Sequence, residues 1–200
     1  MKIHGNSGSG NCLKIRYLAD HLGVAYDWVE VDILKSETRT PSFLALSPMG
    51  RVPVVELDDG RPLAESNAIL LHLAEGSALL PEDRYERAKV HELMFWEQYS
   101  HEPYIAVCRF HMLYLGRVPE EREAWRVERA EQALDLMESL LGKGRDWFVA
   151  NRPTVADICL LPYTRFADEG GFDLSPRPAV RSWIRRCEDV LGLERRTPAD

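Results

Sequence analysis

The sequence predicts a two-part chain, an α/β domain with a mixed four-stranded sheet followed by an all-helical domain. Over residues 1–75, β-branched runs and helical patterns follow the order strand, helix, strand, helix, strand, strand, helix. After residue 83 no convincing strand pattern returns, and apolar residues recur at helical spacing. Residues 76–83 contain Gly, Ser and Pro and are the expected linker. We therefore expect domains at residues 1–75 and 84–200.

The first strand, helix and strand are expected within the first 31 residues. Lys2–His4 is a short strand candidate, and the glycine- and serine-rich stretch Gly5–Asn11 follows it as a loop. A helical pattern starts at Cys12 and ends at Gly23, a typical C-cap residue. Ala25–Val31 alternates as a second strand. Two strands joined by a helix predict parallel pairing with a right-handed crossover.

A hairpin completes the predicted sheet. A polar loop over Asp32–Thr40 leads to a short helix at Pro41–Leu46, where proline suits the first turn. Val52–Leu57 is rich in β-branched residues and is expected to be a strand. The Asp58–Gly60 turn signals a hairpin, so Arg61–Leu63 should return antiparallel to it. The sheet is therefore expected to be mixed, with helices on both faces.

Two features of this hairpin predict a binding site. Pro53 is unusual in a buried strand because it donates no hydrogen bond to the ladder, and a cis peptide bond is one way to accommodate it. Ser66 is placed to be the N-cap of the helix over Ala68–Ala74. We expect backbone groups beside Pro53 and the N–H groups after Ser66 to receive a small anionic ligand.

The rest of the chain is expected to be helical. Asp83 caps a helical pattern over Arg84–Gly116, which Pro103 should bend or break. A second strong helix is predicted over Glu120–Leu141, and a last amphipathic helix over Pro178–Leu191.

A capping signal lies between these helices. Thr154 and Asp157 have the spacing of a capping box, with Asp in place of the usual Glu, before the apolar run Ile158–Leu161. We interpret this pair as structural, since it would satisfy N–H groups at the start of a buried helix.

Composition limits the classes of partner. The net charge is −7 with a pI near 5.4, so the chain has no excess of basic residues to neutralise nucleic-acid phosphates. The cysteines are far apart and form no CxxC pair, which fits a reducing cytoplasm rather than a disulfide scaffold. We expect no signal peptide, and no apolar run approaches membrane-spanning length.

Four motifs together resemble the cytosolic glutathione transferases. Ser9–Arg16 lies at the first strand-to-helix turn, Gly50–Val55 resembles the family's cis-proline strand, and Glu65–Ser66 matches its acidic-Ser pair. Arg152–Asp157 resembles the N-capping motif of its helical domain. Each motif alone is weak, but their order and spacing cover the whole chain. The chain looks closest to bacterial members and the Ser-using theta and delta classes, because His4–Asn6 stands where other classes keep a catalytic tyrosine.

The resemblance implies an architecture and an activity. The first domain would be thioredoxin-like and bind glutathione as co-substrate, and the helical domain would hold most of an apolar, electrophilic co-substrate. The protein would be a cytoplasmic homodimer with no metal, membrane or nucleic-acid partner. Glutathione-dependent disulfide reduction, isomerisation and dehalogenation remain open within the same fold, as does a non-catalytic regulatory or assembly role.

The resemblance also implies how the thiol of glutathione is activated. The thiolate is the nucleophile, and a free thiol has a pKa of about 8.5. Ser9 is the first candidate donor to the sulfur by family position, and the amide of Asn11 is the second. Cys12 has two interpretations, a thiol that forms a mixed disulfide with glutathione or a small hydrophobic residue packed under the helix, and we favour the second.

By the same resemblance, the hairpin supplies the receptors for the rest of glutathione. The backbone of Val52, beside Pro53, would pair with the cysteinyl part. Ser66 and the N–H groups after it would bind the γ-glutamyl carboxylate. Glu65 would pair with the α-ammonium group. For Glu65 and Ser66 the alternative is plain helix capping.

The remaining candidates lie outside these motifs. Arg51 and the loop at Thr38 could reach the glycyl carboxylate. His101, Tyr104 and Cys108 share one helix face at i, i+3 and i+7 and are candidates for the co-substrate pocket. Core packing or a dimer surface is an equally good interpretation of that face.

The histidines give no metal signature. His91, His101 and His111 are ten residues apart, which scatters them around a helix, and no HExxH motif occurs. We therefore expect no metal site.

Overall fold

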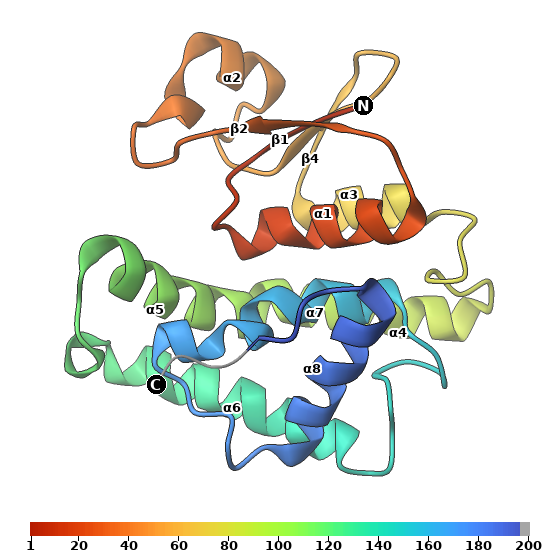
Figure 1. The fold of residues 1–200 in the computed structure, drawn as a ribbon, viewed down its shortest axis with the longest axis vertical. Helices are drawn as coiled ribbons and strands as arrows, with labels where there is room; N and C mark the ends of the chain where they lie inside the picture. The colour runs from red at the N-terminus through yellow and green to blue at the C-terminus, as the bar shows by residue number, and fades with distance from the viewer. Residues whose placement is uncertain (197–200) are drawn as a thin grey trace. The chain divides into compact units, whose positions relative to one another are not determined.

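A computed structural model describes residues 1–196 as two compact units, the first covering Met1–Ser77 and the second beginning at Ala78 (Figure 1). The elements of the first unit are β1 (Lys2–Gly5), α1 (Gly10–Leu22), β2 (Asp27–Glu30), η1 (Glu37–Arg39), α2 (Pro41–Leu46), β3 (Val54–Glu56), β4 (Pro62–Ala64) and α3 (Ser66–Ala74). Within this unit α1 and α3 pack together on one face of the sheet, and α2 lies on the other (Figure 1).

The sheet is mixed and four-stranded, as the sequence predicts. The strand order is β2-β1-β3-β4, with β1 parallel to β2 and antiparallel to β3, and β3 antiparallel to β4. Ile3 in β1 pairs with Val55 in β3, and both are fully buried. Phe43 of α2 packs against Val31 and Val54 on the α2 face of the sheet. The β-branched runs therefore form the central strands because both of their faces are covered.

Element ends differ from the sequence prediction by a few residues. The second strand covers Asp27–Glu30 instead of Ala25–Val31, because only β1 pairs with this edge strand. The first helix begins at Gly10, two residues before Cys12, and ends at Gly23 in the left-handed conformation as predicted. The loop after β2 contains one short 3-10 turn, η1.

The second unit is helical throughout its described part. Its elements are α4 (Arg84–Trp96), η2 (Glu97–His101), α5 (Glu102–Leu115), η3 (Pro119–Glu121), α6 (Ala124–Leu141), α7 (Val155–Arg165), η4 (Ala167–Gly170) and α8 (Pro178–Leu191). Every residue of α7 from Val155 to Thr164 is buried, so this helix is the centre of the unit. Up to residue 196, no strand follows residue 77.

Pro103 interrupts the long helix, as predicted. The α-helical pattern gives way to a π-helical turn, η2, and resumes at Glu102 with Pro103 as the second residue of α5. A proline ring conflicts with the carbonyl group four residues earlier, here that of Tyr99, so the turn before Pro103 cannot stay regular.

The next helix starts later than predicted. Pro119–Glu121 forms a separate 3-10 turn, in which the Glu121 carboxylate accepts a hydrogen bond from the Val118 N–H at 3.0 Å. Because Glu120 and Glu121 belong to this turn, α6 begins at Ala124 rather than at Glu120.

The predicted capping box is present at the start of α7. The Asp157 carboxylate accepts hydrogen bonds from the N–H of Thr154 at 2.8 Å and from its hydroxyl group at 3.0 Å. It also accepts the indole N–H of Trp183 at 2.9 Å and the N–H of Phe148 at 3.4 Å. One carboxylate thus joins α7, α8 and the loop before α7.

The segment between the two predicted domains packs onto the second unit. Leu79 and Leu80 are buried, and the Leu79 carbonyl accepts a hydrogen bond from the Val155 N–H at 3.0 Å. Arg87 donates to the Pro81 carbonyl at 2.8 Å. No helix within residues 1–196 is long and apolar enough to cross a lipid bilayer.

Candidate active site

The turn from β1 into α1 carries the first group of candidate residues. Ser9 is the N-cap of α1, and its carbonyl accepts hydrogen bonds from the N–H groups of Cys12 at 3.1 Å and Leu13 at 2.9 Å. Asn11 is the second helical residue. The first N–H groups of a helix have no intrahelical acceptor and carry partial positive charge, so this end of α1 favours an anion such as a thiolate.

Cys12 lies inside the fold. It has no exposed surface, and its sulfur accepts the Asn6 N–H at 3.4 Å. Burial raises the pKa of the Cys12 thiol to about 11, although the Ser9 side chain and the Asn6 N–H act in the opposite direction. A thiol with this pKa stays protonated at neutral pH, which supports the packing interpretation over a mixed disulfide.

Asn11 and Ser66 meet although 55 residues separate them in the sequence. The hydroxyl group of Ser66 donates to the Asn11 amide oxygen at 3.3 Å, and Ser66 is only 5% exposed. The contact joins the start of α1 to the start of α3, so two predicted parts of the site lie together.

The prediction that Ser66 caps α3 is wrong by one residue. Ser66 is the first helical residue, and Glu65 holds the N-cap position without a side-chain capping bond. Glu65 is exposed, and its backbone has φ 67° and ψ 112°, a combination that residues with a Cβ rarely adopt. The hydroxyl group of Ser66 is directed to Asn11 instead, and the first N–H groups of α3 have no acceptor within their own helix.

The Val52–Pro53 peptide bond is cis, one of the forms expected at this proline. The ladder starts after it, with Val54 paired to Ala64, so the backbone of Val52 lies outside the paired part of β3. Val52 itself is half-buried against the cluster around Phe43.

Thr38 and Arg51 flank a tight turn at Gly50. Gly50 has φ 61°, and a Cβ at this position would lie 2.5 Å from the Arg39 guanidinium group. Arg39 donates to the Met49 carbonyl at 3.4 Å and is thereby held against the turn. Thr38 is buried and Arg51 is exposed.

The three co-substrate candidates differ in burial. His101 and Cys108 have no exposed surface, and the His101 ring nitrogen Nε2 is 2.9 Å from the hydroxyl group of Thr164 in α7. Their burial favours the core-packing alternative for both. Tyr104 is half-buried, with its ring edge-on to Trp125 at 6.1 Å between ring centres. Tyr104 is therefore the one of the three with surface to offer a ligand.

A cavity in the second unit was not anticipated from the sequence. It measures about 500 Å³ and is lined by residues between Arg165 and Arg196. Its sequence signal is the pair Arg181 and Arg185 one helical turn apart beside Ile184. Among the residues that the structure describes, no three His, Cys, Asp or Glu side chains are grouped so that they could hold a metal ion.

Comparisons with known proteins cover both units. Residues 8–75 match the family model described as the glutathione S-transferase N-terminal domain, and residues 119–186 match the C-terminal domain of the same family. The maleylacetoacetate isomerase of Rhizobium meliloti is 31% identical over 92% of this chain and 90% of its own length. The disulfide-bond oxidoreductase YfcG of Escherichia coli is 28% identical over 86% of this chain and 83% of its own length. The crystal structure of a glutathione S-transferase from Pseudomonas fluorescens is 48% identical, covers 94% of both chains and superposes with a TM-score of 0.90.

Proposed function

Because the chain belongs to the glutathione S-transferase family, we propose that it is an enzyme that binds glutathione and activates its thiol for attack on a small, largely apolar electrophile. The observation that carries the proposal is the hydrogen bond between Ser66 and Asn11. It brings a carboxylate receptor, the start of α3, next to a thiol donor at the start of α1. A single bound peptide with a carboxylate and a thiol would use both.

The receptors for the peptide follow from the local backbone. The unpaired backbone of Val52, next to the cis bond to Pro53, is available to an extended ligand strand. Ser66 and the first N–H groups of α3 bind the γ-glutamyl carboxylate, and Glu65 binds the adjacent ammonium group. The sparsely populated backbone of Glu65 supports a ligand-binding role, since such conformations cluster at functional sites.

Thiol activation rests on Asn11, Ser9 and the N-terminus of α1. The donors hold the glutathione sulfur as a thiolate, which forms the new bond to the electrophilic carbon while the leaving group departs with its electrons. Ser66 holds the side chain of Asn11 at the start of α1 through the Asn11 amide oxygen. We therefore propose Asn11 as the main donor and Ser9 as the secondary one.

The glutathione claim is tested by calorimetry on the wild-type protein and on Glu65→Gln and Ser66→Ala. Loss of a hydrogen bond to a charged group costs about 1.5–3 kcal/mol, so Glu65→Gln should weaken binding roughly tenfold to 150-fold. Ser66→Ala removes the contact that holds Asn11 and should also weaken binding. Glu82→Gln, an exposed residue of the second unit, is the matched control and should bind as wild type. Absence of binding by the wild-type protein at millimolar glutathione would defeat the proposal.

Glutathione-dependent disulfide reduction is the second candidate, because one relative bears the name of a disulfide-bond oxidoreductase. In that reaction two glutathione molecules become one disulfide while the substrate disulfide becomes two thiols, with no need for a protein cysteine. Conjugation of a chlorinated nitrobenzene and reduction of a small disulfide, assayed side by side, distinguish the two. We also propose a homodimer, which light scattering during gel filtration would test.

A further inference from the structure

The turn between β1 and α1, which carries the proposed thiol donors, is held from the neighbouring strand β2. The carboxylate of Glu30, the last residue of β2, accepts a hydrogen bond from the Ser7 N–H at 2.9 Å and another from the Ser7 hydroxyl group at 2.7 Å. One residue further on, the Val31 carbonyl accepts a hydrogen bond from the side-chain amide of Asn6 at 3.2 Å. Ser7 precedes Ser9 by two residues, so these contacts act on the turn itself.

The turn is closed by its own hydrogen bonds. The Ser9 N–H donates to the Asn6 carbonyl at 2.9 Å, and the Gly8 N–H donates to the Asn6 side-chain oxygen at 3.1 Å. Ser7 lies between these residues and is exposed. In the part of the chain that the structure describes, Glu30 is the one hydrogen-bond partner of Ser7. A change at Glu30 therefore releases the middle of the turn.

Glu30 also fixes the side chain next to the turn. Its carboxylate accepts the indole N–H of Trp28 at 2.7 Å. The ring of Trp28 lies so close to Gly5, the last residue of β1, that a Cβ at Gly5 would be 2.6 Å from it. The guanidinium group of Arg16 in α1 lies 5.7 Å from the centre of the same ring. One carboxylate thus reaches the end of β1, the turn and, through Trp28, the first helix.

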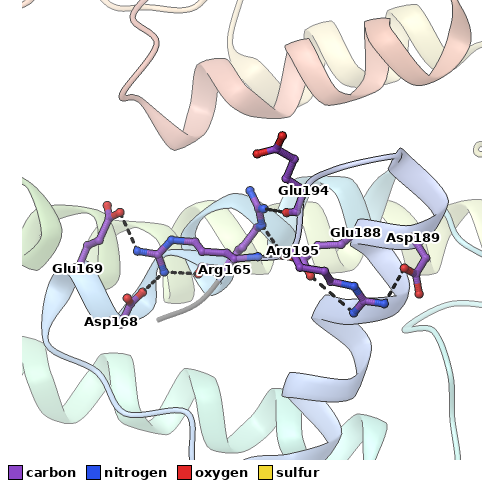
Figure 2. Close-up of polar contacts among 8 residues, drawn as sticks. Arg165, Asp168, Glu169, Glu188, Asp189, Glu194 and Arg195 are labelled. Atoms are coloured by element: carbon purple, nitrogen blue, oxygen red, sulfur yellow. Dashed lines mark hydrogen bonds and ion pairs between the residues drawn. The ribbon is translucent and has the colours of Figure 1, made fainter. Parts of the chain in front are cut away.

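Carboxylates of the second unit are held in a different way. Glu188 accepts a hydrogen bond from Arg165 at 2.8 Å, and Asp189 accepts one from Arg195 at 2.6 Å, so each forms an ion pair between two side chains (Figure 2). Among the residues that the structure describes, Glu30 forms no ion pair, and its donors are neutral. Because one of these donors is a main-chain N–H, Glu30 fixes the position of the backbone.

The charge of Glu30 does not explain its place beside the proposed thiol site. Desolvation acts to raise the pKa of this carboxyl group, but the donors from Ser7 and Trp28 outweigh it and lower the pKa, so Glu30 is ionised at neutral pH. Besides burial, the Glu30 charge contributes to the raised pKa of Cys12. An anion at this place works against a thiolate, so the useful property of Glu30 is its hydrogen bonding.

We propose that Glu30 is a positioning residue for thiol activation. It holds both the N–H and the hydroxyl group of Ser7, and it thereby keeps the turn in the arrangement that places Ser9 and Asn11 against the sulfur of bound glutathione. Glu30 acts through Ser7 and not by contact with the peptide. This inference rests on the proposed glutathione activity.

The thiol pKa of bound glutathione separates positioning from a charge effect. If only charge acts, removal of the carboxylate lowers the thiol pKa, because the thiolate loses a repulsion. Loss of positioning raises the thiol pKa, because the donors no longer meet the sulfur. Glu30→Ala should therefore raise the pKa by about half a unit or more, measured by thiolate absorbance. At a pH below this pKa, the thiolate fraction and kcat should fall about threefold, while Kd for glutathione should change less than about twofold.

Two further variants make the test specific. Glu30→Gln removes the charge, but its amide oxygen can accept the Ser7 N–H and its NH₂ group can donate to the Ser7 hydroxyl oxygen. This variant should therefore not raise the thiol pKa. Asp27→Ala is the matched control, because it removes another exposed carboxylate of β2 at the other end of the strand. It should leave the thiol pKa, kcat and Kd unchanged.

Several outcomes would overturn the proposal. A thiol pKa that falls or stays constant in Glu30→Ala would do so, as would an equal rise in Glu30→Gln. A lower Tm with an unchanged thiol pKa would make Glu30 a purely structural residue. If Glu30→Ala proves unfolded, Ser7→Ala removes one of the two bonds and should also raise the pKa. Absence of glutathione binding by the wild-type protein defeats the proposed function as well, whereas the results above in a protein that binds glutathione defeat this proposal alone.

Discussion

The Asp157→Ala variant should unfold at a much lower temperature while its affinity for glutathione stays unchanged. Asp157 is 1% exposed, and its carboxylate accepts hydrogen bonds from the main chain and hydroxyl group of Thr154, from Trp183 and from Phe148. Burial raises the pKa of this carboxyl group, and the four donors act in the opposite direction. Alanine removes the acceptor and leaves the donors in place.

The size of the effect follows from which donors lose their partner. The Thr154 N–H and the indole N–H of Trp183 are buried, and each orphaned donor costs about 1–3 kcal/mol. The Thr154 hydroxyl group can rotate to another acceptor, and removal of a buried carboxyl group recovers part of its desolvation cost. A net loss of about 3 kcal/mol results, more than the roughly 1 kcal/mol of an ordinary N-cap. In a chain of this length it lowers Tm by about 6–12 °C.

Thermal and urea unfolding, followed by circular dichroism, measure the loss of stability. Asp146→Ala is the matched control, because Asp146 is exposed and its ion pair with Arg186 spans 3.6 Å, so the free energy of unfolding should change by less than about 0.5 kcal/mol. Glutathione affinity is measured at a temperature where both variants are folded. A Tm change below about 3 °C, or a tenfold loss of affinity in a fully folded Asp157→Ala protein, would refute the argument.

Three further predictions concern the first unit. Cys12→Ala should keep conjugation activity within about threefold, and abolished turnover in this variant would contradict the packing interpretation. At pH 8 the native protein should react only slowly with a thiol reagent, because Cys12 has a pKa of about 11 and stays protonated. Asn11→Ala should raise the pKa of the thiol of bound glutathione by about one unit, or 1.4 kcal/mol, which is more than Ser9→Ala should raise it. The absorbance of the thiolate measures this pKa. The reverse order would make Ser9 the main donor. Glu65→Gly should bind glutathione at least tenfold more weakly. Its free energy of unfolding should not fall, because glycine adopts φ 67° without strain. A less stable variant would show that the Glu65 side chain supports the fold.

Local signals in the sequence are enough to predict several of these features. The Asp58–Gly60 turn, the unusual Pro53 and the Thr154–Asp157 capping box each depend on residues within a few positions of one another. The fold class follows from the change of hydrophobic period after residue 83, because that pattern reports which faces are buried.

Contacts between distant segments could not be predicted in this way. His101 ends the π-helical turn η2, whereas Tyr104 and Cys108 lie in α5, and their spacing in the sequence does not reveal what covers them. In the structure α7 lies against this helix, and the hydroxyl group of Thr164 meets His101, so two of the three residues became core. Prediction of a pocket from one helix fails for His101 because the buried helix α7 covers it.

The same limit explains the change in the proposed thiol donor. In the sequence Ser9 and Asn11 are equivalent polar residues at one turn, and family position alone favours Ser9. The fold distinguishes them, because the Asn11 amide oxygen accepts a hydrogen bond from the Ser66 hydroxyl group at 3.3 Å. The contact with Ser66 holds the Asn11 side chain at the start of α1, where the thiol of a bound peptide is expected. The order of Asn11→Ala and Ser9→Ala in thiol pKa therefore tests whether the contact with Ser66 selects the donor.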